Sequence, residues 1–397
     1  MVADAGGPVR GGAFAKDRAG AAEATAGAPI ASAAPAGERI HLSWRAFSFP
    51  LTGSLRTAAG SLAGRRGWLL RLQRTQGGEG WGEAAPLAFG EALDGALERC
   101  ALALRQLRSP ATREELERRL PSLPPPLAFA LGAALAEADG LVGEAGGGWR
   151  PAPASAWLLP AGEEALTVAR SLLAARSRCT GFALGQGPPP DTDPEMGGPV
   201  SATPLTLKWK VGVHSEREER VWHRQLVALL PADARLRLDA NGGFDRATAW
   251  RWADHLRGDA HLDWLEQPLD PADQEGLEAL ARQLPVALDE SLLRAPELRH
   301  RWAGWQVRRP SQEGDPRPLL RALEEGRPRW MVSTSFETGI GQRWLAHLAA
   351  LQVAGPTPAA PGLAPGWLAP GDLGSAQPEA VWQAVGESGA TGVPRVD

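Results

Sequence analysis

The chain has 397 residues, of which 43% are hydrophobic, so it can bury a large core and is too long for one ordinary small domain. Its formal net charge of -4 gives no general attraction to nucleic acid or to an anionic membrane, and we expect neither as a partner. Two cysteines, Cys100 and Cys179, provide no disulfide framework and suit a reducing compartment. The sequence has no membrane-spanning apolar run and no recognisable secretory signal, so we predict a cytoplasmic protein that acts on a small molecule, with its oligomeric state left open.

The N-terminal part is predicted to hold an extension followed by a capping domain. Residues 1–37 are rich in alanine and glycine with few large apolar side chains, so we expect a disordered extension. Residues 38–148 combine strand and helix patterns, which favours a compact α+β unit. Strands are expected at 41–51, at 66–74 and from Gly80, with a Gly/Ala/Ser-rich loop at 57–64 and helices at 92–107 and 127–142.

Residues 149–350 repeat a short apolar strand and a helix-like segment at intervals of about 20 to 30 residues. This spacing predicts an α/β fold whose parallel sheet is either closed as a barrel or left open. Residues 185–203 are too rich in proline and glycine for either element, so we predict an inserted loop, and residues 351–397 are expected to pack back on the capping domain. The strand candidates are 154–160, 206–213, 234–241, 262–268, 286–291, 305–310 and 331–336.

Two lysines mark the second of these strand candidates. Lys208 and Lys210 are two residues apart, so both side chains project to the same face of the strand. Of the 42 basic residues, the only other lysine is Lys16. Arginine stays protonated at ordinary pH, whereas repulsion between two ammonium groups lowers the pKa of at least one of them and lets a lysine act as a base. The alternative for such a pair is a solvated edge strand.

Three acidic residues end the next three strand candidates. Asp239, Glu266 and Asp289 each follow apolar residues, and the carboxyl ends of barrel strands meet at one mouth. Three carboxylates gathered there would repel one another and lose hydration, so a bound cation is expected. Ligation by oxygen alone selects Mg²⁺, with Mn²⁺ possible, over zinc. Taken singly, each acidic residue could equally be a helix cap or a surface group.

From about residue 40 to residue 345 the chain resembles the enolase superfamily and, within it, the o-succinylbenzoate synthases of menaquinone and phylloquinone biosynthesis. The resemblance implies a modified TIM (β/α) barrel with an α+β cap, the barrel spanning residues 149–350. The residues that match the family motifs are Lys208 and Lys210 of K-x-K, Arg237, Asp239 and Asn241 of R-x-D-x-N, Glu266 with Pro268, Asp289 with Glu290, Gly82 to Leu87, and STSFETGIG at Ser333 to Gly341.

The resemblance also implies a mechanism. Lys210 would remove the proton α to a substrate carboxylate bound to Mg²⁺ and return it to the departing hydroxide, with Lys208 beside it; a lysine base with magnesium is the pairing described for this superfamily. The substrate would be 2-succinyl-6-hydroxy-2,4-cyclohexadiene-1-carboxylate and the product 2-succinylbenzoate. The same resemblance implies that Arg237, Asn241, Ser333, Ser335 and Gly339 bind the substrate or support its ligands, although the last three fit an ordinary turn and helix cap equally well. The segment from Leu55 to Gly64, together with the strand from Gly80, would close the mouth.

One position departs from the family pattern. Arg309 stands where the family has a lysine before proline, and this lysine is the second acid or base in racemases and epimerases. Arginine cannot take up that proton, although its charge can still stabilise an intermediate. The alternatives that stay open are an N-acylamino-acid racemase or dipeptide epimerase on the same scaffold, and a non-catalytic metal-binding barrel.

Overall fold

The computed structural model describes residues 38–57, 60–182 and 204–386. They fall within one compact unit, residues 35–397. The predicted extension at 1–37 and the predicted inserted loop at 185–203 lie outside the described residues, as does the side chain of Cys179. Among the described helices, none combines the length and the apolar character that crossing a membrane requires.

The N-terminal part contains an antiparallel sheet with the strand order β3-β2-β1-β4. Its strands are β1 (Arg39–Thr57), β2 (Gly60–Arg74), β3 (Glu79–Ala84) and β4 (Ala111–Thr112). For the described residues, the prediction of a loop at 57–64 was wrong, because Gly64 pairs with Pro50 and Leu62 pairs with Leu55 across the β1–β2 ladder. Ladder hydrogen bonds come from the backbone, so small side chains do not prevent pairing in a two-stranded ribbon.

Three helices accompany this sheet: α1 (Glu91–Gln106), α2 (Arg113–Arg119) and α3 (Pro125–Ala138). The first and last confirm the helices predicted at 92–107 and 127–142, whereas α2 was missed. Helix α1 buries Leu97, Cys100, Ala101 and Leu104, which recur at three- and four-residue spacing. Burial raises the pKa of the Cys100 thiol to about 12, so this cysteine acts as a small apolar side chain. Helix α2 begins at a reciprocal cap between Thr112 and Glu115.

Strand β3 packs directly on α3, backbone against backbone. A Cβ atom added to Gly80 would lie 1.8 Å from the Ala134 carbonyl oxygen, and one added to Gly82 would lie 2.0 Å from that of Ala130. We expect Gly80→Ala to lower the free energy of unfolding by about 1–3 kcal/mol or more, since backbone atoms must move apart. Gly95→Ala is the matched control, because a Cβ there meets only the flexible end of Arg99 at 3.4 Å. In thermal unfolding the control should be neutral or slightly stabilising, and a similar loss in both variants would contradict the close approach.

The second sheet has seven parallel strands in the order β11-β10-β9-β8-β7-β6-β5. All seven strand candidates are confirmed. They are β5 (Trp157–Leu159), β6 (Thr206–Lys210), β7 (Arg235–Asp239), β8 (Leu262–Glu266), β9 (Val286–Leu288), β10 (Trp305–Arg308) and β11 (Trp330–Val332). In β6 the alternation places Leu207 and Trp209 in the apolar cluster shared with the helices and leaves Lys208 and Lys210 on the opposite, inner face.

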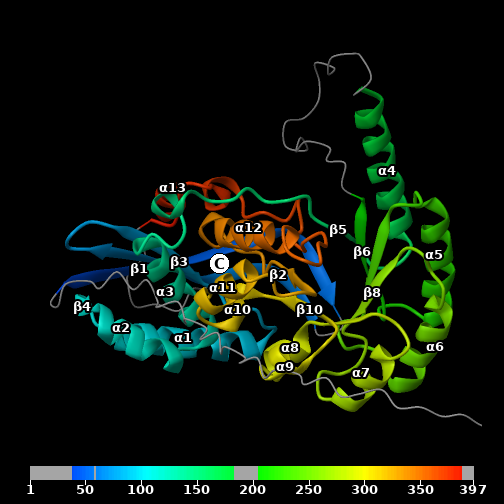
Figure 1. Cartoon of the computed structure of the whole chain (residues 1–397), viewed down its shortest axis with the longest axis horizontal. Coiled ribbons are helices and arrows are strands. Elements are labelled where there is room, and N and C mark those ends of the chain that lie inside the picture. The colour runs from blue at the N-terminus through cyan, green and yellow to red at the C-terminus, as the bar shows by residue number, and fades with distance from the viewer. Residues whose placement is uncertain (1–37, 58–59, 183–203, 387–397) are drawn as a thin grey trace, which may run out of the picture. The chain divides into compact units, whose positions relative to one another are not determined.

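Helices follow the strands and cover the outer face, as α5 and α6 do beside β6 and β8 in Figure 1. Apolar residues of the helices within 164–301 join those of strands β5 to β9 in one buried cluster, whereas those of the last two helices, within 317–353, pack with α3 in a second cluster. The helices are α4 (Glu164–Phe182), α5 (Glu216–Leu229), α6 (Arg246–Leu256), α7 (Gln274–Ala281), α8 (Glu290–Arg294), α9 (Leu298–Arg301), α10 (Pro310–Glu313), α11 (Arg317–Glu324) and α12 (Gly339–Val353).

The two edges of this sheet are joined by residues 361–362. The Gly362 N–H donates to the Val332 carbonyl at 2.8 Å on the β11 side. The Pro361 carbonyl accepts from the Ala156 N–H at 2.9 Å on the β5 side. The sheet is therefore closed, and the fold is an α/β barrel accompanied by an α+β cap, as the sequence predicted.

The chain beyond the barrel contacts the cap. Helix α13 (Pro378–Ala384) places Val381 and Trp382 in an apolar cluster with Phe47, Phe49 and Trp81 of the cap strands. The Arg45 guanidinium donates to the Trp382 carbonyl at 2.7 Å. We propose the predicted divisions, a cap at 38–148, a barrel at 149–350 and a C-terminal segment at 351–397, as the domain organisation.

Candidate functional site

The carboxyl ends of the barrel strands carry the charged residues that the sequence singled out. Lys210 ends β6 and lies opposite Asp239, which ends β7 and lies opposite Glu266 at the end of β8. Asp289 directly follows β9, and Arg309 directly follows β10. Because parallel strands end at the same mouth, this register places all of them at one end of the barrel. The Lys210, Asp239, Glu266 and Asp289 residues are each at most 5% exposed.

Both lysines point toward the carboxylates rather than into solvent. The Lys208 ammonium bridges two carboxylates, at 2.9 Å from Asp239 Oδ2 and 2.5 Å from Glu266 Oε1. Lys210 donates to Asp239 Oδ2 at 3.1 Å and to Asn241 Oδ1 at 2.6 Å. The alternative of a solvated edge strand is therefore wrong, because β6 lies between β5 and β7 in the sheet.

The pKa of Lys208 shifts opposite to the direction that repulsion between the two lysines would give. Burial alone would lower the pKa of Lys208, but the negative charges of Asp239, Glu266 and Asp289 outweigh burial and raise it above its usual range. The same two lysines hold the pKa of the buried Asp239 carboxyl well below its usual range, against the effect of burial. Lys208 is therefore a permanent cation in this arrangement, and its role is electrostatic.

Arg309 forms a further ion pair of the site, with Asp289. Its Nε and Nη2 groups donate to the two oxygens of Asp289, at 2.7 Å and 2.5 Å. Its Nη1 group donates to the Thr334 carbonyl at 2.7 Å, and its backbone N–H donates to Glu313 at 2.7 Å. Asp289 raises the pKa of the Arg309 guanidinium above its ordinary value despite burial, so the group keeps its charge.

Glu290 adds a fourth carboxylate that the sequence suggested only as part of a motif. Its Oε1 atom accepts from Asn241 Nδ2 at 3.0 Å, and its buried Oε2 atom has no hydrogen-bond partner within the described part of the chain. Burial, followed by repulsion from Asp289 and Asp239, raises the pKa of Glu290 to about 8. Asn241 reaches both Lys210 and Glu290 from a left-handed backbone conformation with φ of 45°. One oxygen of this fourth carboxyl group thus lacks a partner among the described residues.

The donor chemistry fits a hard divalent cation, because every candidate ligand is a carboxylate oxygen. In the arrangement seen, however, no group of three His, Cys, Asp or Glu side chains within residues 38–57, 60–182 and 204–386 is placed to hold a metal ion. The reason is that Lys208 lies between Asp239 and Glu266, while Arg309 takes both oxygens of Asp289. The residues that would hold Mg²⁺ are thus gathered at one mouth and paired with internal cations.

Two of the predicted substrate contacts, Arg237 and Ser333, form hydrogen bonds within the protein. Arg237 is fully buried, stacks on Trp264 at 3.9 Å and donates to Asp263 at 2.9 Å and to the Ala360 carbonyl at 2.7 Å, so it supports the barrel interior. Ser333 donates to the Gly362 carbonyl at 3.3 Å.

Two further predicted contacts lie between β11 and α12. The buried Ser335 hydroxyl has no hydrogen-bond partner in the described chain. Gly339 begins α12, and a Cβ there would lie 1.8 Å from the Ser375 carbonyl oxygen, so packing explains this glycine.

A buried network between cap and barrel was missed by the sequence reasoning. Glu83 Oε2, from β3, accepts from the Thr338 N–H at 2.9 Å, the Thr338 hydroxyl at 2.6 Å and the Gly341 N–H at 3.2 Å, and so caps α12. Glu337 accepts from the Ser311 hydroxyl at 2.6 Å and from the Ser335 N–H at 2.9 Å. The signal was present in the sequence, since Glu83 lies in the G-E motif and Glu337 in STSFETGIG, but their contact depends on tertiary packing.

This network predicts a specific pH dependence of stability. Burial and, next, the charge of Glu337 raise the pKa of Glu83 from 4.5 to about 7, while Thr338 and the buried Arg65 counteract the shift. Between pH 4.5 and about pH 7, Glu83 keeps its proton in the folded protein but has lost it in the unfolded chain. The free energy of unfolding therefore falls as pH rises through this range, by about 3 kcal/mol in all. Glu83→Gln cannot titrate, and its stability should lack this fall. Urea unfolding of both proteins at about pH 5 and about pH 8 measures the difference, and parallel pH profiles would contradict the assignment.

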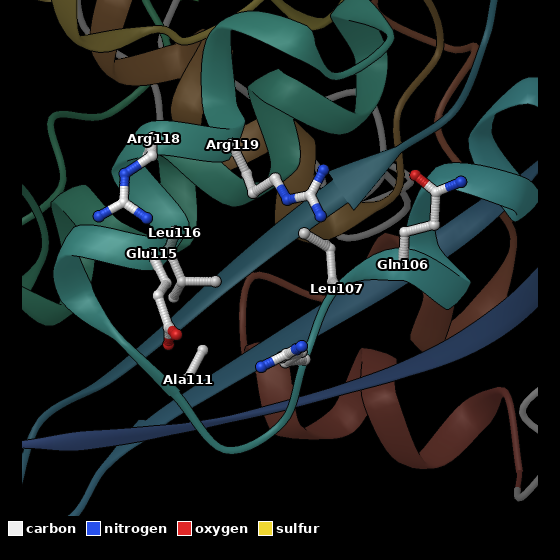
Figure 2. A pocket seen from close by; sticks show the side chains of 8 residues that line it. Gln106, Leu107, Ala111, Glu115, Leu116, Arg118 and Arg119 are labelled. Carbon is white, nitrogen blue, oxygen red and sulfur yellow. The ribbon is translucent and has the colours of Figure 1, made fainter.

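A separate cavity of about 170 Å³ lies within the cap. It is lined by Gln106, Leu107, Arg108, Ala111, Glu115, Leu116, Arg118 and Arg119, as Figure 2 shows. Arg118 pairs with Glu114 at 2.9 Å, and Glu115 belongs to the cap of α2. None of the predicted site residues lines this cavity, so the barrel mouth is the candidate site.

Known proteins resemble this chain in sequence and in fold. Residues 204–303 match the family described as enolase C-terminal domain-like. The o-succinylbenzoate synthase of Thermosynechococcus vestitus is 34% identical over 317 residues, which cover 77% of this chain and 87% of that protein. A solved structure of o-succinylbenzoate synthase from Thermosynechococcus elongatus, with magnesium in its active site, is 30% identical with a TM-score of 0.65, covering 87% of this chain and 99% of the other.

More distant relatives share the fold. The L-Ala-D/L-Glu epimerase of Bacillus subtilis is 20% identical with a TM-score of 0.59, covering 79% of this chain and 87% of its own. A hydrophobic dipeptide epimerase from a Flavobacteria bacterium is 33% identical, but over only 93 residues, or 22% of this chain and 26% of that protein. The chain therefore belongs to the enolase superfamily and, within it, to the o-succinylbenzoate synthase family.

Proposed function

We propose that this enzyme is an o-succinylbenzoate synthase that dehydrates 2-succinyl-6-hydroxy-2,4-cyclohexadiene-1-carboxylate to 2-succinylbenzoate in a Mg²⁺-dependent reaction. The observation that carries the proposal is a buried lysine amine, Lys210, beside a cluster of carboxylates at the barrel mouth. A relative of that name with 34% identity over most of the chain supports it. The enzyme would then serve menaquinone or phylloquinone biosynthesis in the cytoplasm.

In this proposal Lys210 makes both proton transfers. Its neutral amine takes the proton α to the substrate carboxylate, and the electron pair of that C–H bond forms the new ring double bond as the C–O bond to the hydroxyl breaks. The protonated Lys210 then gives the proton to the departing hydroxide, which leaves as water. One base suffices because both proton transfers occur on one face of the ring.

Asp239, Glu266 and Asp289 are the residues proposed to hold the cation, Mg²⁺ or alternatively Mn²⁺. A bound divalent cation supplies positive charge where negative charge develops on the substrate carboxylate. Lys208 adds a fixed charge beside it. Asn241 orients the Lys210 amine through its hydrogen bond of 2.6 Å. Ser333, Ser335 and the N–H groups near Gly339 are proposed to meet the succinyl carboxylate.

Arg309 distinguishes this reaction from the racemase alternative. A racemase or epimerase needs an acid and a base on opposite sides of the carbon, and a guanidinium keeps its protons at ordinary pH. The pairing with Asp289 raises the pKa of the Arg309 guanidinium further, so this group is even less able to give up a proton. Because epimerases are among the similar proteins, epimerase activity is the second candidate function.

The test is an ultraviolet assay for the aromatic product with protein stripped by EDTA and then supplied with Mg²⁺ or Mn²⁺. We expect product only with the metal. Incubation with an N-acylamino acid or a dipeptide in D₂O provides the comparison, and we expect no exchange at the α-carbon. Exchange without succinylbenzoate formation would favour the epimerase, and the absence of both activities would favour a non-catalytic barrel.

A further inference from the structure

The charges at the barrel mouth nearly balance without any added ion. Within the described chain the site residues comprise four carboxylates, which belong to Asp239, Glu266, Asp289 and Glu290, and three cations, which belong to Lys208, Lys210 and Arg309. The ion pairs among them are short, and Asp239, Glu266 and Asp289 are at most 1% exposed. Buried carboxylates require such partners, because an unpaired buried charge is strongly destabilising.

Arg309 is the cation that engages both oxygens of one carboxylate, that of Asp289. Lys208 is a single point charge on Glu266 Oε1, and Glu266 Oε2 accepts only a long bond of 3.3 Å from Trp264. Arg309, by contrast, donates to both oxygens of Asp289 at once, so its positive charge lies against each oxygen that could bind a cation.

Two further hydrogen bonds, to Thr334 and Glu313, fix the position of Arg309. Its third nitrogen donates to the Thr334 carbonyl at 2.7 Å, and its backbone N–H donates to Glu313 at 2.7 Å. The side chain of Arg309 is 13% exposed and that of Asp289 is fully buried, so little water competes for the pair. A lysine at this position would lack the planar fork that matches both carboxylate oxygens, so it would hold at least one Asp289 oxygen less firmly.

We infer that Arg309 is an intramolecular counter-ion for Asp289 that a divalent cation must displace, so that this residue sets the metal affinity of the site. The inference rests on the proposed metal-dependent function. In the metal-free protein Arg309 keeps Asp289 ionised and paired. Cation binding breaks at least one of its two bonds to Asp289 while the bond to Thr334 keeps the guanidinium at the mouth.

The experiment measures Mn²⁺ binding to EDTA-treated full-length protein by the electron paramagnetic resonance signal of free Mn²⁺. Arg309→Lys is expected to bind Mn²⁺ about tenfold more tightly than the wild type, since one Asp289 oxygen is released. Arg308→Lys is the matched control, because Arg308 pairs with Glu313 instead of the mouth carboxylates, and its Mn²⁺ affinity should equal that of the wild type.

A second readout does not require a quantitative affinity. Arg309→Met leaves Asp289 without a cation, so its melting temperature in EDTA should fall below that of the wild type, and Mg²⁺ should raise it by more than it raises the wild type. Equal Mn²⁺ affinity in wild type and Arg309→Lys, or weaker binding in the variant, overturns the inference while the proposed function stands. If neither protein binds Mn²⁺, the proposed metal-dependent function fails, and the inference fails with it.

Discussion

Lys210→Ala is expected to lower kcat for succinylbenzoate formation by about 10²–10⁴-fold, the range that one positioned acid or base contributes. Among the described residues beside it, neither Lys208 nor Asn241 can take over as the base. Lys208 is fixed between Asp239 and Glu266, and Asn241 has no basic atom. KM should change less than kcat, because Lys210 acts on the reacting proton. Steady-state ultraviolet assays at saturating Mg²⁺ separate the two constants.

Lys210→Arg is the control that isolates proton transfer from charge. Arginine preserves a positive partner for Asp239 and so keeps the buried carboxylate compensated, but it cannot give up a proton at ordinary pH. We expect this variant to unfold at nearly the wild-type temperature and to be as inactive as the alanine variant. Full activity in Lys210→Arg would remove this residue from the role of base.

Asp239→Asn is expected to destabilise the metal-free protein by about 3–5 kcal/mol, the cost of breaking a buried ion pair. Among the described carboxylates, Asp239 is the one that contacts both lysines, at 2.9 Å and 3.1 Å, and it is 1% exposed. The asparagine leaves the two ammonium groups close together with less negative charge nearby. Urea unfolding in EDTA measures the change in the free energy of unfolding.

The matched control is Asp254→Asn on the surface of α6. Asp254 pairs with Arg257 at 2.7 Å, but both side chains are about 70% exposed, and such pairs contribute at most about 1 kcal/mol. Mn²⁺ titration of both variants completes the test, since only Asp239→Asn should lose binding. Equal stability of the two variants would show that the buried ion pairs of Asp239 contribute no more to the free energy of unfolding than an exposed pair does.

The location of the site could be predicted because it depends on local pattern and one topological rule. Each strand of the barrel is a short apolar run, and Lys210, Asp239 and Glu266 stand at the last residue of β6, β7 and β8. Parallel strands bring those ends together whatever the intervening helices contain. Neither the strand lengths nor the helix sequences had to be known in detail for this inference.

The pairings within the site could not be predicted, because they depend on which side chains meet across the barrel. The sequence places Lys208 next to Lys210 and therefore suggests repulsion, whereas the fold adds Asp239, Glu266 and Asp289 and reverses the direction of the pKa shift of Lys208. The contact of Glu83 with Thr338 spans 255 residues along the chain. No local periodicity encodes a contact of that kind.

Backbone pairing accounts for two further features that the sequence pattern did not reveal. The ribbon formed by β1 and β2 continues through small residues that composition assigned to a loop. The closure of the barrel by Pro361 and Gly362 involves too few residues to leave a strand pattern in the sequence. Both features depend on hydrogen bonds between main-chain atoms, which are the same for every residue type except proline.

Pro361 and Gly362, which join the two edges of the barrel sheet, bear on the order in which the chain folds during synthesis. The β5 strand is complete at Leu159, yet the Pro361 carbonyl that accepts from the neighbouring Ala156 N–H is synthesised some two hundred residues later. Until then β5 and β11 each present an unpaired strand edge, the kind of surface through which nascent chains associate wrongly. Synthesis of residues 361–362, rather than formation of any single βα unit, therefore determines when these two strand edges can be covered.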